Sequence, residues 1–285
     1  MIYTSKLLIF IMSIEKKFLF NIKILLISLL LLLIYSFDYS LGWGMNLMFP
    51  KIYFFTHGVG NQGWNLLIWS ENGVVETLQI IILFITLLIL INLYLNKNLK
   101  SKLINIFLLI EIIGITYIFF EEISWGQHFI KFKTPELFLD KSSFLFNKQE
   151  EFNFHNTSNL FNELPRSLIL IWCSLSILLY RSINALKISN FAIIIEPNKK
   201  LLILSYIILT LSVPDLIVNK LELIDNSKLF IFNNNNFERY NLYQLFLSVI
   251  TLNFVRFSEL QELLFYYYFF WHTVFFKNKL ENIQY

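Results

Sequence analysis

The sequence predicts an all-α protein, a polytopic membrane helix bundle of about six transmembrane helices in a single domain over residues 1–285. Three observations support this fold class. Of the residues, 56% are hydrophobic and only 15% are charged, and the mean hydropathy is +0.59. The apolar residues also gather in blocks close to the roughly 20 residues that a helix needs to cross a bilayer. Finally, lysine and arginine concentrate in alternate connections between these blocks. A water-soluble globule is therefore excluded.

Each predicted span is an apolar segment in which the backbone amides can bond within one helix. Lysines precede the first segment, as in a signal peptide, but no small-residue cleavage pattern follows it, so we expect a retained signal anchor. The last apolar tract, 242–276, contains polar residues and allows either one helix or a short re-entrant segment followed by a span. The predicted spans are approximately 18–37, 74–95, 103–120, 168–186, 201–218 and 254–276.

The positions of lysine and arginine predict the orientation of the chain. These residues favour both terminal segments and the second and fourth connections, which are expected on the cytoplasmic side. The segments 38–73 and 121–165 then lie outside, and acidic residues outnumber lysines in the second of them. We therefore expect a multi-pass membrane protein, in contact with the lipid bilayer, with cytoplasmic N- and C-termini.

Charge and cysteine content exclude further classes of protein. Lysine and arginine number 23 against 20 acidic residues, and this net charge of +3 is too small and too scattered to bind a nucleic acid. Cys173 is the single cysteine, so the chain contains neither a disulfide framework nor a cysteine-based zinc site.

The strongest motif is the segment 121–128, EEISWGQH, at the outer end of the third predicted span. Adjacent carboxylates such as Glu121 and Glu122 in a poorly solvated place favour a proton donor or acceptor near neutral pH. Alternatively, the motif is an interfacial belt with Trp125 at head-group depth. Gly126 could also end the helix and leave Gln127 and His128 in a loop. On a continuous helix, one face would carry Glu121, Ser124, Trp125 and His128.

A second motif is the segment 147–156, NKQEEFNFHN. In a helix, Glu151 and His155 would meet at positions i and i+4, and an extended chain would also bring this carboxylate and imidazole to one edge. The alternative is a solvated Asn-rich loop, although Phe152 and Phe154 require an apolar cover. The hydrogen-bonding residues on one edge of an extended chain would be Asn147, Gln149, Glu151, Asn153 and His155.

Other acidic residues lie at the ends of predicted spans. Glu71 and Glu76 flank the start of the second span. The N-terminal end of a helix is positive and attracts carboxylates, so both residues also have a purely structural explanation. In the last tract, Arg256 can neutralise Glu259, and Glu262 can pair with a neighbouring helix. His272 lies in an aromatic run and is predicted to be a packing histidine.

The motifs ENGVVE at 71–76, EEISWGQ at 121–127 and NKQEEFNFHN at 147–156 resemble those of an uncharacterised family of bacterial polytopic inner-membrane proteins. The resemblance covers roughly residues 69–156 and supports the choice of site residues without implying a reaction. The Glu-Glu pair alone is also weakly similar to the CAAX-type intramembrane glutamic proteases. Their motif continues to an arginine where this chain has Gly126 and Gln127.

These residues predict a Glu- and His-rich site at the outer face, in an enzyme that acts on a lipid or lipid-linked substrate. The alternatives are an ion- or proton-coupled transporter and a non-catalytic membrane assembly protein. We expect no acidic residue at mid-membrane depth, and this argues against a transporter. The site would work by metal-free acid–base chemistry or through a divalent metal. The candidate catalytic residues are Glu121, Glu122, His128, Glu151 and His155. The candidate metal ligands are His128, His155, Glu121 and Glu151. The candidate substrate-binding residues are Glu71, Glu76, Trp125, Gln127, Gln149, Asn153, Asn156, Glu259 and Glu262.

Overall fold

The computed structural model is all-helical, and no strand occurs among the residues that it describes. The chain divides into two compact units, Met1–Val74 with Leu211–Leu260, and Val75–Thr210 with Gln261–Tyr285. The second unit contains most of the candidate site and is the focus below. The structure describes residues 2–41, 73–96, 102–147, 150, 152–154, 157, 159–185, 198–215, 252 and 257–283.

In the first unit, the long helix α1 spans Ile2–Leu41. Its stretch Lys16–Ile34 is long and apolar enough to cross a membrane. Leucine and isoleucine dominate this stretch, and large side chains such as Phe20 and Leu31 are exposed. In water this surface would be costly, whereas in a bilayer hydrocarbon covers it.

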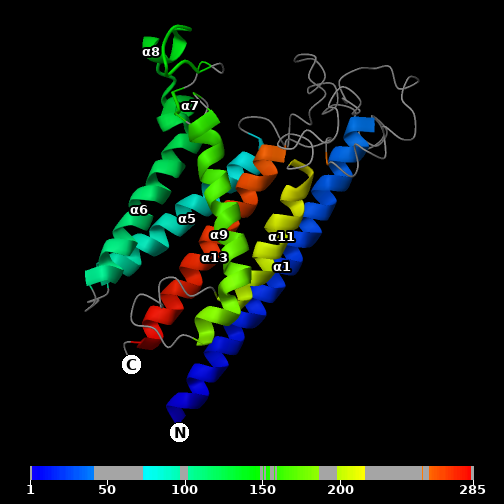
Figure 1. The fold of residues 1–285 in the computed structure, drawn as a ribbon, viewed down its shortest axis with the longest axis vertical. Helices are drawn as coiled ribbons and strands as arrows, with labels where there is room; N and C mark the ends of the chain where they lie inside the picture. Colours follow the sequence, from blue (N-terminus) through cyan, green and yellow to red (C-terminus); the bar gives the residue numbers. More distant parts are fainter. Residues whose placement is uncertain are drawn as a thin grey trace. The chain divides into compact units, whose positions relative to one another are not determined.

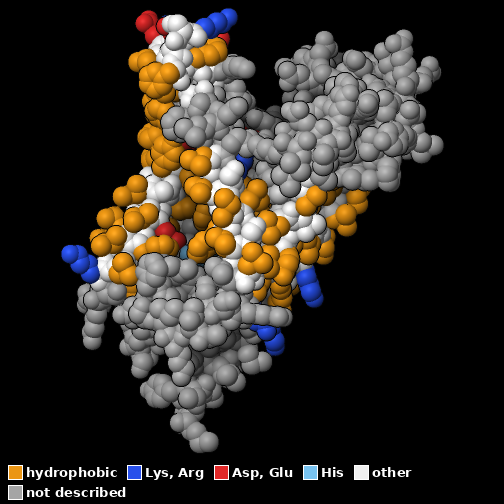
Figure 2. All heavy atoms as spheres, in the orientation of Figure 1, with side chains coloured by type: hydrophobic (Ala, Val, Ile, Leu, Met, Phe, Trp, Pro, Cys, Tyr) orange, Lys and Arg blue, Asp and Glu red, His pale blue; other side chains and the backbone are white. Residues whose placement is uncertain are grey.

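In the second unit, α5 (Val74–Asn96) and α6 (Lys102–Glu122) are the two most apolar helices. Both are long and apolar enough to span a membrane, as Val74–Leu95 and Lys102–Glu122. They lie side by side (Figure 1), with the rings of Phe84 and Phe119 5.9 Å apart. Hydrophobic side chains also cover much of the visible surface of α6 (Figure 2).

Three further helices occur at the remaining predicted spans. They are α9 (Asn159–Ala185), α11 (Lys199–Asp215) and α13 (Phe257–Ile283). The last begins directly after Arg256 and continues beyond the expected end at residue 276, while the first part of tract 242–276 lies outside the described residues. In the second unit α11 contacts α13, since the Lys200 ammonium lies 5.2 Å from the centre of the Phe275 ring.

A small cap, defined as residues 123–154, follows α6. It includes one turn of 3-10 helix, η1 (Ser124–Gly126), and two single-turn helices, α7 (Gln127–Ile130) and α8 (Glu136–Leu139). Of the two alternatives for this motif, a continuous helix through His128 is wrong, because α6 ends at Glu122. The other alternative, a loop at Gln127 and His128, is also wrong, because both residues belong to the new helix α7. The break occurs at three consecutive left-handed residues, with φ of 45° at Ser124, 53° at Trp125 and 85° at Gly126. Only glycine adopts this region at little cost.

Candidate functional site

Glu121, the first carboxylate of the EEISWGQH motif, is used to attach the cap to α6. Its side chain lies at the end of α6 and is buried. Glu121 Oε1 accepts a hydrogen bond from the indole of Trp125 at 2.7 Å, and Oε2 accepts the backbone N–H of Phe154 at 2.7 Å. The left-handed turn directs Trp125 back to this carboxylate.

Gln127 makes a second attachment of the same kind. Its Oε1 accepts the backbone N–H of Phe152 at 2.7 Å, and its Nε2 donates to Thr134 Oγ1 at 2.7 Å. The Thr134 hydroxyl in turn donates to the carbonyl of Glu150. Gln127 and Glu121 together therefore hold the segment 152–154 through two of its backbone N–H groups.

The cap interior contains a buried asparagine pair. Asn147 Nδ2 donates to Asn153 Oδ1 at 2.8 Å, and Asn153 Nδ2 lies 3.4 Å from Ser124 Oγ. Both asparagine side chains are buried. Buried polar side chains need such partners, so the described part of the NKQEEFNFHN motif has a clear structural role.

Aromatic rings cover this polar network. Phe138 of α8 lies 5.0 Å from Phe152 and 5.4 Å from Phe154, measured between ring centres. The expectation that these two phenylalanines need an apolar cover is thus confirmed. Trp125 stacks on Phe120 with centres 5.3 Å apart, which joins the cap to the last turn of α6.

Beside this attachment, α6, α9 and α13 enclose a cavity of about 80 Å³, which we call the polar cavity. The hydroxyl of Tyr266 donates to Glu122 Oε1 at 2.6 Å, and Arg166 forms an ion pair with Glu262. The predicted pairing of Glu262 with a neighbouring helix is therefore confirmed, with α9 as that helix. Both side chains of the ion pair are mostly buried. The residues that line the polar cavity are Tyr117, Ile118, Glu121, Glu122, Pro165, Arg166, Ile169, Glu262, Phe265 and Tyr266.

The structure brings only some of the predicted site residues together. Glu121, Glu122 and Glu262 line the polar cavity, whereas Trp125, Gln127 and Asn153 lie in the cap. Glu76 lies in the first turn of α5, and Glu259 is buried in the first turn of α13. His128 belongs to α7, but its side chain is not among those described. The predicted residues outside the described part of the chain are Glu71, Gln149, Glu151, His155 and Asn156.

Within the described residues, no group of three or more His, Cys, Asp or Glu side chains could hold a metal ion. The predicted metal set includes Glu151, His155 and the His128 side chain, which all lie outside this part of the chain. A divalent metal at the outer face therefore stays a prediction.

Sequence reasoning missed two residues of the polar cavity. Arg166 is an arginine beside a predicted span, and this position alone indicates a functional residue. Tyr266 lies in a long aromatic run, and no local pattern distinguishes it from its neighbours.

The expectation that acids are absent from mid-membrane depth is wrong. Glu111 lies in the middle of α6, and its Oε1 is 3.5 Å from Nδ1 of His272 on α13. His272 also stacks on Phe276 with ring centres 6.2 Å apart, so it packs as predicted but faces a carboxylate as well.

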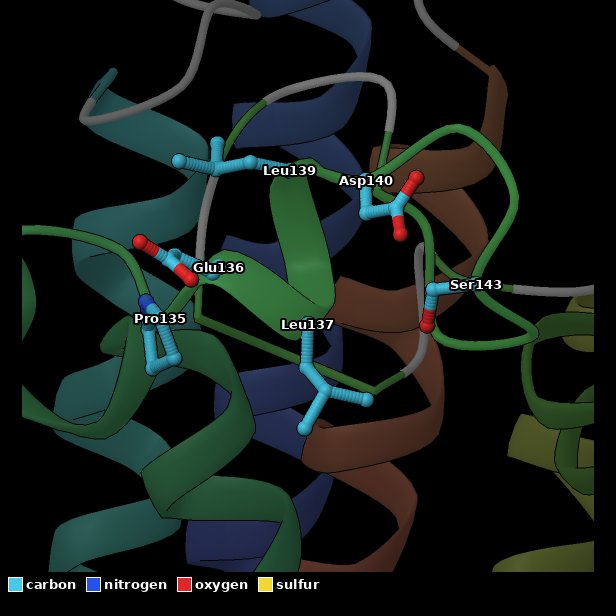
Figure 3. A pocket seen from close by; sticks show the side chains of 6 residues that line it. All are labelled: Pro135, Glu136, Leu137, Leu139, Asp140 and Ser143. Carbon is cyan, nitrogen blue, oxygen red and sulfur yellow. The ribbon is translucent and has the colours of Figure 1, made fainter.

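A second hollow, of about 780 Å³, lies at the tip of the cap (Figure 3). Leu137 and Leu139 line it together with Glu136 and Asp140, and all four are exposed. Asp140 accepts hydrogen bonds from the backbone N–H and the hydroxyl of Ser142, at 2.9 and 2.8 Å. These bonds favour the charged form and lower the pKa of Asp140 below its ordinary value.

Comparison with known proteins adds no relative, since no protein-family model, no curated protein and no solved structure matches the chain. The chemistry of the described residues is therefore the remaining indication of function. Among them, the polar cavity combines charged, hydroxyl and apolar side chains from three helices.

Proposed function

We propose that this chain is a six-span protein of the bacterial inner membrane, with both termini in the cytoplasm, and that its polar cavity binds the head group of a lipid or lipid-linked substrate at the outer face. Three apolar helices support membrane insertion. The positions of α9, α11 and α13 at the other three predicted segments support six spans. The motif resemblance to bacterial inner-membrane proteins supports the location.

One observation carries the head-group assignment. Glu122, Arg166 and Glu262 come from three helices and line one cavity, so both signs of charge are available there. The wall of the same cavity includes Ile118 and Phe265. A lipid presents a charged head group beside an apolar chain, and binding sites for such molecules combine a few polar groups with an apolar lining.

The chemistry of this site follows from its side chains. The Glu122 carboxylate, held by the Tyr266 hydroxyl, can exchange a proton with a bound head group, as a general acid or base does. The planar guanidinium of Arg166 suits a phosphate or carboxylate. Glu121 is a positioning residue, because it holds the cap beside the cavity. Glu151, His155 and His128 remain predicted contributors to this site.

Binding can be tested with the purified full-length protein in detergent. Its thermal stability would be measured with short-chain phosphatidylethanolamine and phosphatidylglycerol, for wild type and for Glu122→Gln. The control is Glu136→Gln, the same change at an exposed cap residue outside the polar cavity. We expect at least one lipid to stabilise wild type and the control but not Glu122→Gln. Equal stabilisation of all three proteins would contradict the proposal.

A second experiment separates catalysis from binding. Proteoliposomes made from bacterial polar lipids would be incubated with each protein, and the lipids analysed by mass spectrometry. A product formed by wild type and Glu136→Gln, but absent with Glu122→Gln, supports an enzyme. Loss of lipid binding without any product supports a non-catalytic role of the same site.

The alternative of a proton-coupled carrier is favoured by one observation, the mid-helix pair Glu111 and His272. Between Glu111 and Glu122, however, α6 presents Ile115, which is buried, and Ile118, which lines the polar cavity. Glu111 is also not among the residues that line the polar cavity, so the two carboxylates do not belong to one site. We therefore place head-group binding first.

A further inference from the structure

Glu111 and His272 face each other in the middle of two long helices, α6 and α13. Glu111 Oε1 lies 3.5 Å from His272 Nδ1, and both side chains are 19% exposed. A separation of 3.5 Å is long for a hydrogen bond but short enough for an ion pair. The other carboxylate oxygen of Glu111, Oε2, is buried and has no hydrogen bond among the described residues.

Apolar side chains lie one turn away from this pair in both directions along α6. One turn toward the start of α6, Phe107 meets Phe276 of α13 with ring centres 5.7 Å apart. One turn toward Glu122, Ile115 is buried. Within the described residues, no other charged side chain is paired with Glu111 or His272. Tyr268, one turn before His272 on α13, lies near Cys173 of α9 and Ser205 of α11.

The charge of the pair is limited by these surroundings. An isolated ion costs several kcal/mol in an apolar interior, whereas a carboxyl and an imidazole that share one exchangeable proton carry no net charge. Neither loss of that proton nor gain of a second leaves the pair neutral. The closed helix interface therefore favours one bound proton.

We propose that Glu111 and His272 form a proton-binding site between α6 and α13, and that separation of these helices at neutral or higher pH releases the proton. The hydrogen bond from Tyr266 to Glu122 joins the same two helices about three turns away, roughly 16 Å along α6. A ligand that parts α6 from α13 at the polar cavity is then linked to proton release. This proton link stands independently of head-group binding, because it rests on the Glu111–His272 contact.

The pH dependence follows from proton counting. In water, a glutamate carboxyl and an imidazole have pKa values of about 4.3 and 6.5. The hydrated pair thus holds two protons below about pH 4.3, one between these values, and none above about pH 6.5, while the closed pair holds one. Opening is therefore favoured about tenfold per pH unit as the pH rises above 6.5, and likewise as it falls below 4.3.

The test is reversible unfolding of the full-length protein in mixed detergent micelles between pH 6 and 8.5. Wild type would be compared with Glu111→Gln, in which the closed and hydrated states both carry a neutral imidazole above about pH 6.5. We expect the unfolding equilibrium constant of wild type to rise about tenfold more than that of Glu111→Gln between pH 7 and 8. Glu136→Gln, at an exposed position, should retain the wild-type slope.

A second variant protects the test against misfolding. The double change Glu111→Gln with His272→Asn replaces the pair by two neutral amides that can bond to each other, and it should also lack the extra slope. Equal pH slopes for wild type and for either variant would overturn the proposal. The pH slopes do not depend on whether Glu122→Gln loses lipid binding. The proton-site proposal and the head-group proposal can therefore be refuted independently of each other.

Discussion

The carboxylate of Glu121 accepts the backbone N–H of Phe154, 33 residues further along the chain, at 2.7 Å. Its other oxygen accepts the indole of Trp125, so one buried side chain links the end of α6, the left-handed turn and the far end of the cap. Charge-assisted hydrogen bonds of this kind are among the stronger ones in proteins. Glu121 therefore holds the cap beside the polar cavity.

The replacement Glu121→Gln should destabilise the cap. An amide offers only one acceptor oxygen, so either Trp125 or Phe154 loses its partner, and an unsatisfied buried donor costs about 1–3 kcal/mol. Equilibrium unfolding in detergent gives the free energy, and amide hydrogen exchange at Phe154 locates the loss. The matched change Glu136→Gln at an exposed position should alter stability by less than about 0.5 kcal/mol. Equal effects of the two changes would argue against the anchoring role.

The ion pair between Arg166 and Glu262 should show strong coupling in a double-mutant cycle. Both side chains are 15% exposed, so Arg166→Met or Glu262→Leu alone leaves a mostly buried charge without its partner. We expect each single change to cost about 3 kcal/mol or somewhat more. The double change should cost clearly less than the sum, as measured by equilibrium unfolding. Additive costs would show that the pair does not hold α9 to α13.

Glycine should be the favoured residue at two left-handed positions in the cap. Gly126 has φ of 85°, and an added Cβ would meet only Ile130 Cδ1, at 3.8 Å. Gly126→Ala should therefore cost roughly 1–2 kcal/mol through backbone conformation rather than a clash. Lys131 has φ of 57°, so Lys131→Gly should be neutral or slightly stabilising. Thermal unfolding of both variants checks this, and a stabilising Gly126→Ala would contradict the observed turn.

The titration of Asp140 should depend on Ser142. The two hydrogen bonds from Ser142 lower the pKa of Asp140 in the folded state, so their contribution is present above the unfolded pKa of about 3.9 and is lost as pH falls through the lower folded value. In Ser142→Ala the hydroxyl bond is absent, and the midpoint should rise toward the ordinary value. Carboxyl carbon NMR during an acid titration measures it. An unchanged midpoint would exclude the hydroxyl as a cause.

The positions of the helices could be predicted from sequence, because an apolar block of about 20 residues must satisfy its backbone amides within itself. Helices occur at the predicted segments 18–37, 74–95 and 103–120, and these three are also apolar enough to span a membrane. The end of α6 was harder to predict. Its position depends on the Glu121 contact with Phe154, which lies far away in the sequence.

The sequence by itself determined the helical class, the apolar segments and the presence of carboxylates at the EEISWGQH motif. Only the tertiary structure decided their partners, because the rotation of each helix about its axis selects which side chains meet. This rotation placed Arg166 against Glu262 and Tyr266 against Glu122, and it left Glu121 to hold the cap. Residues in an evenly apolar helix carry no periodic pattern from which such facing could be read.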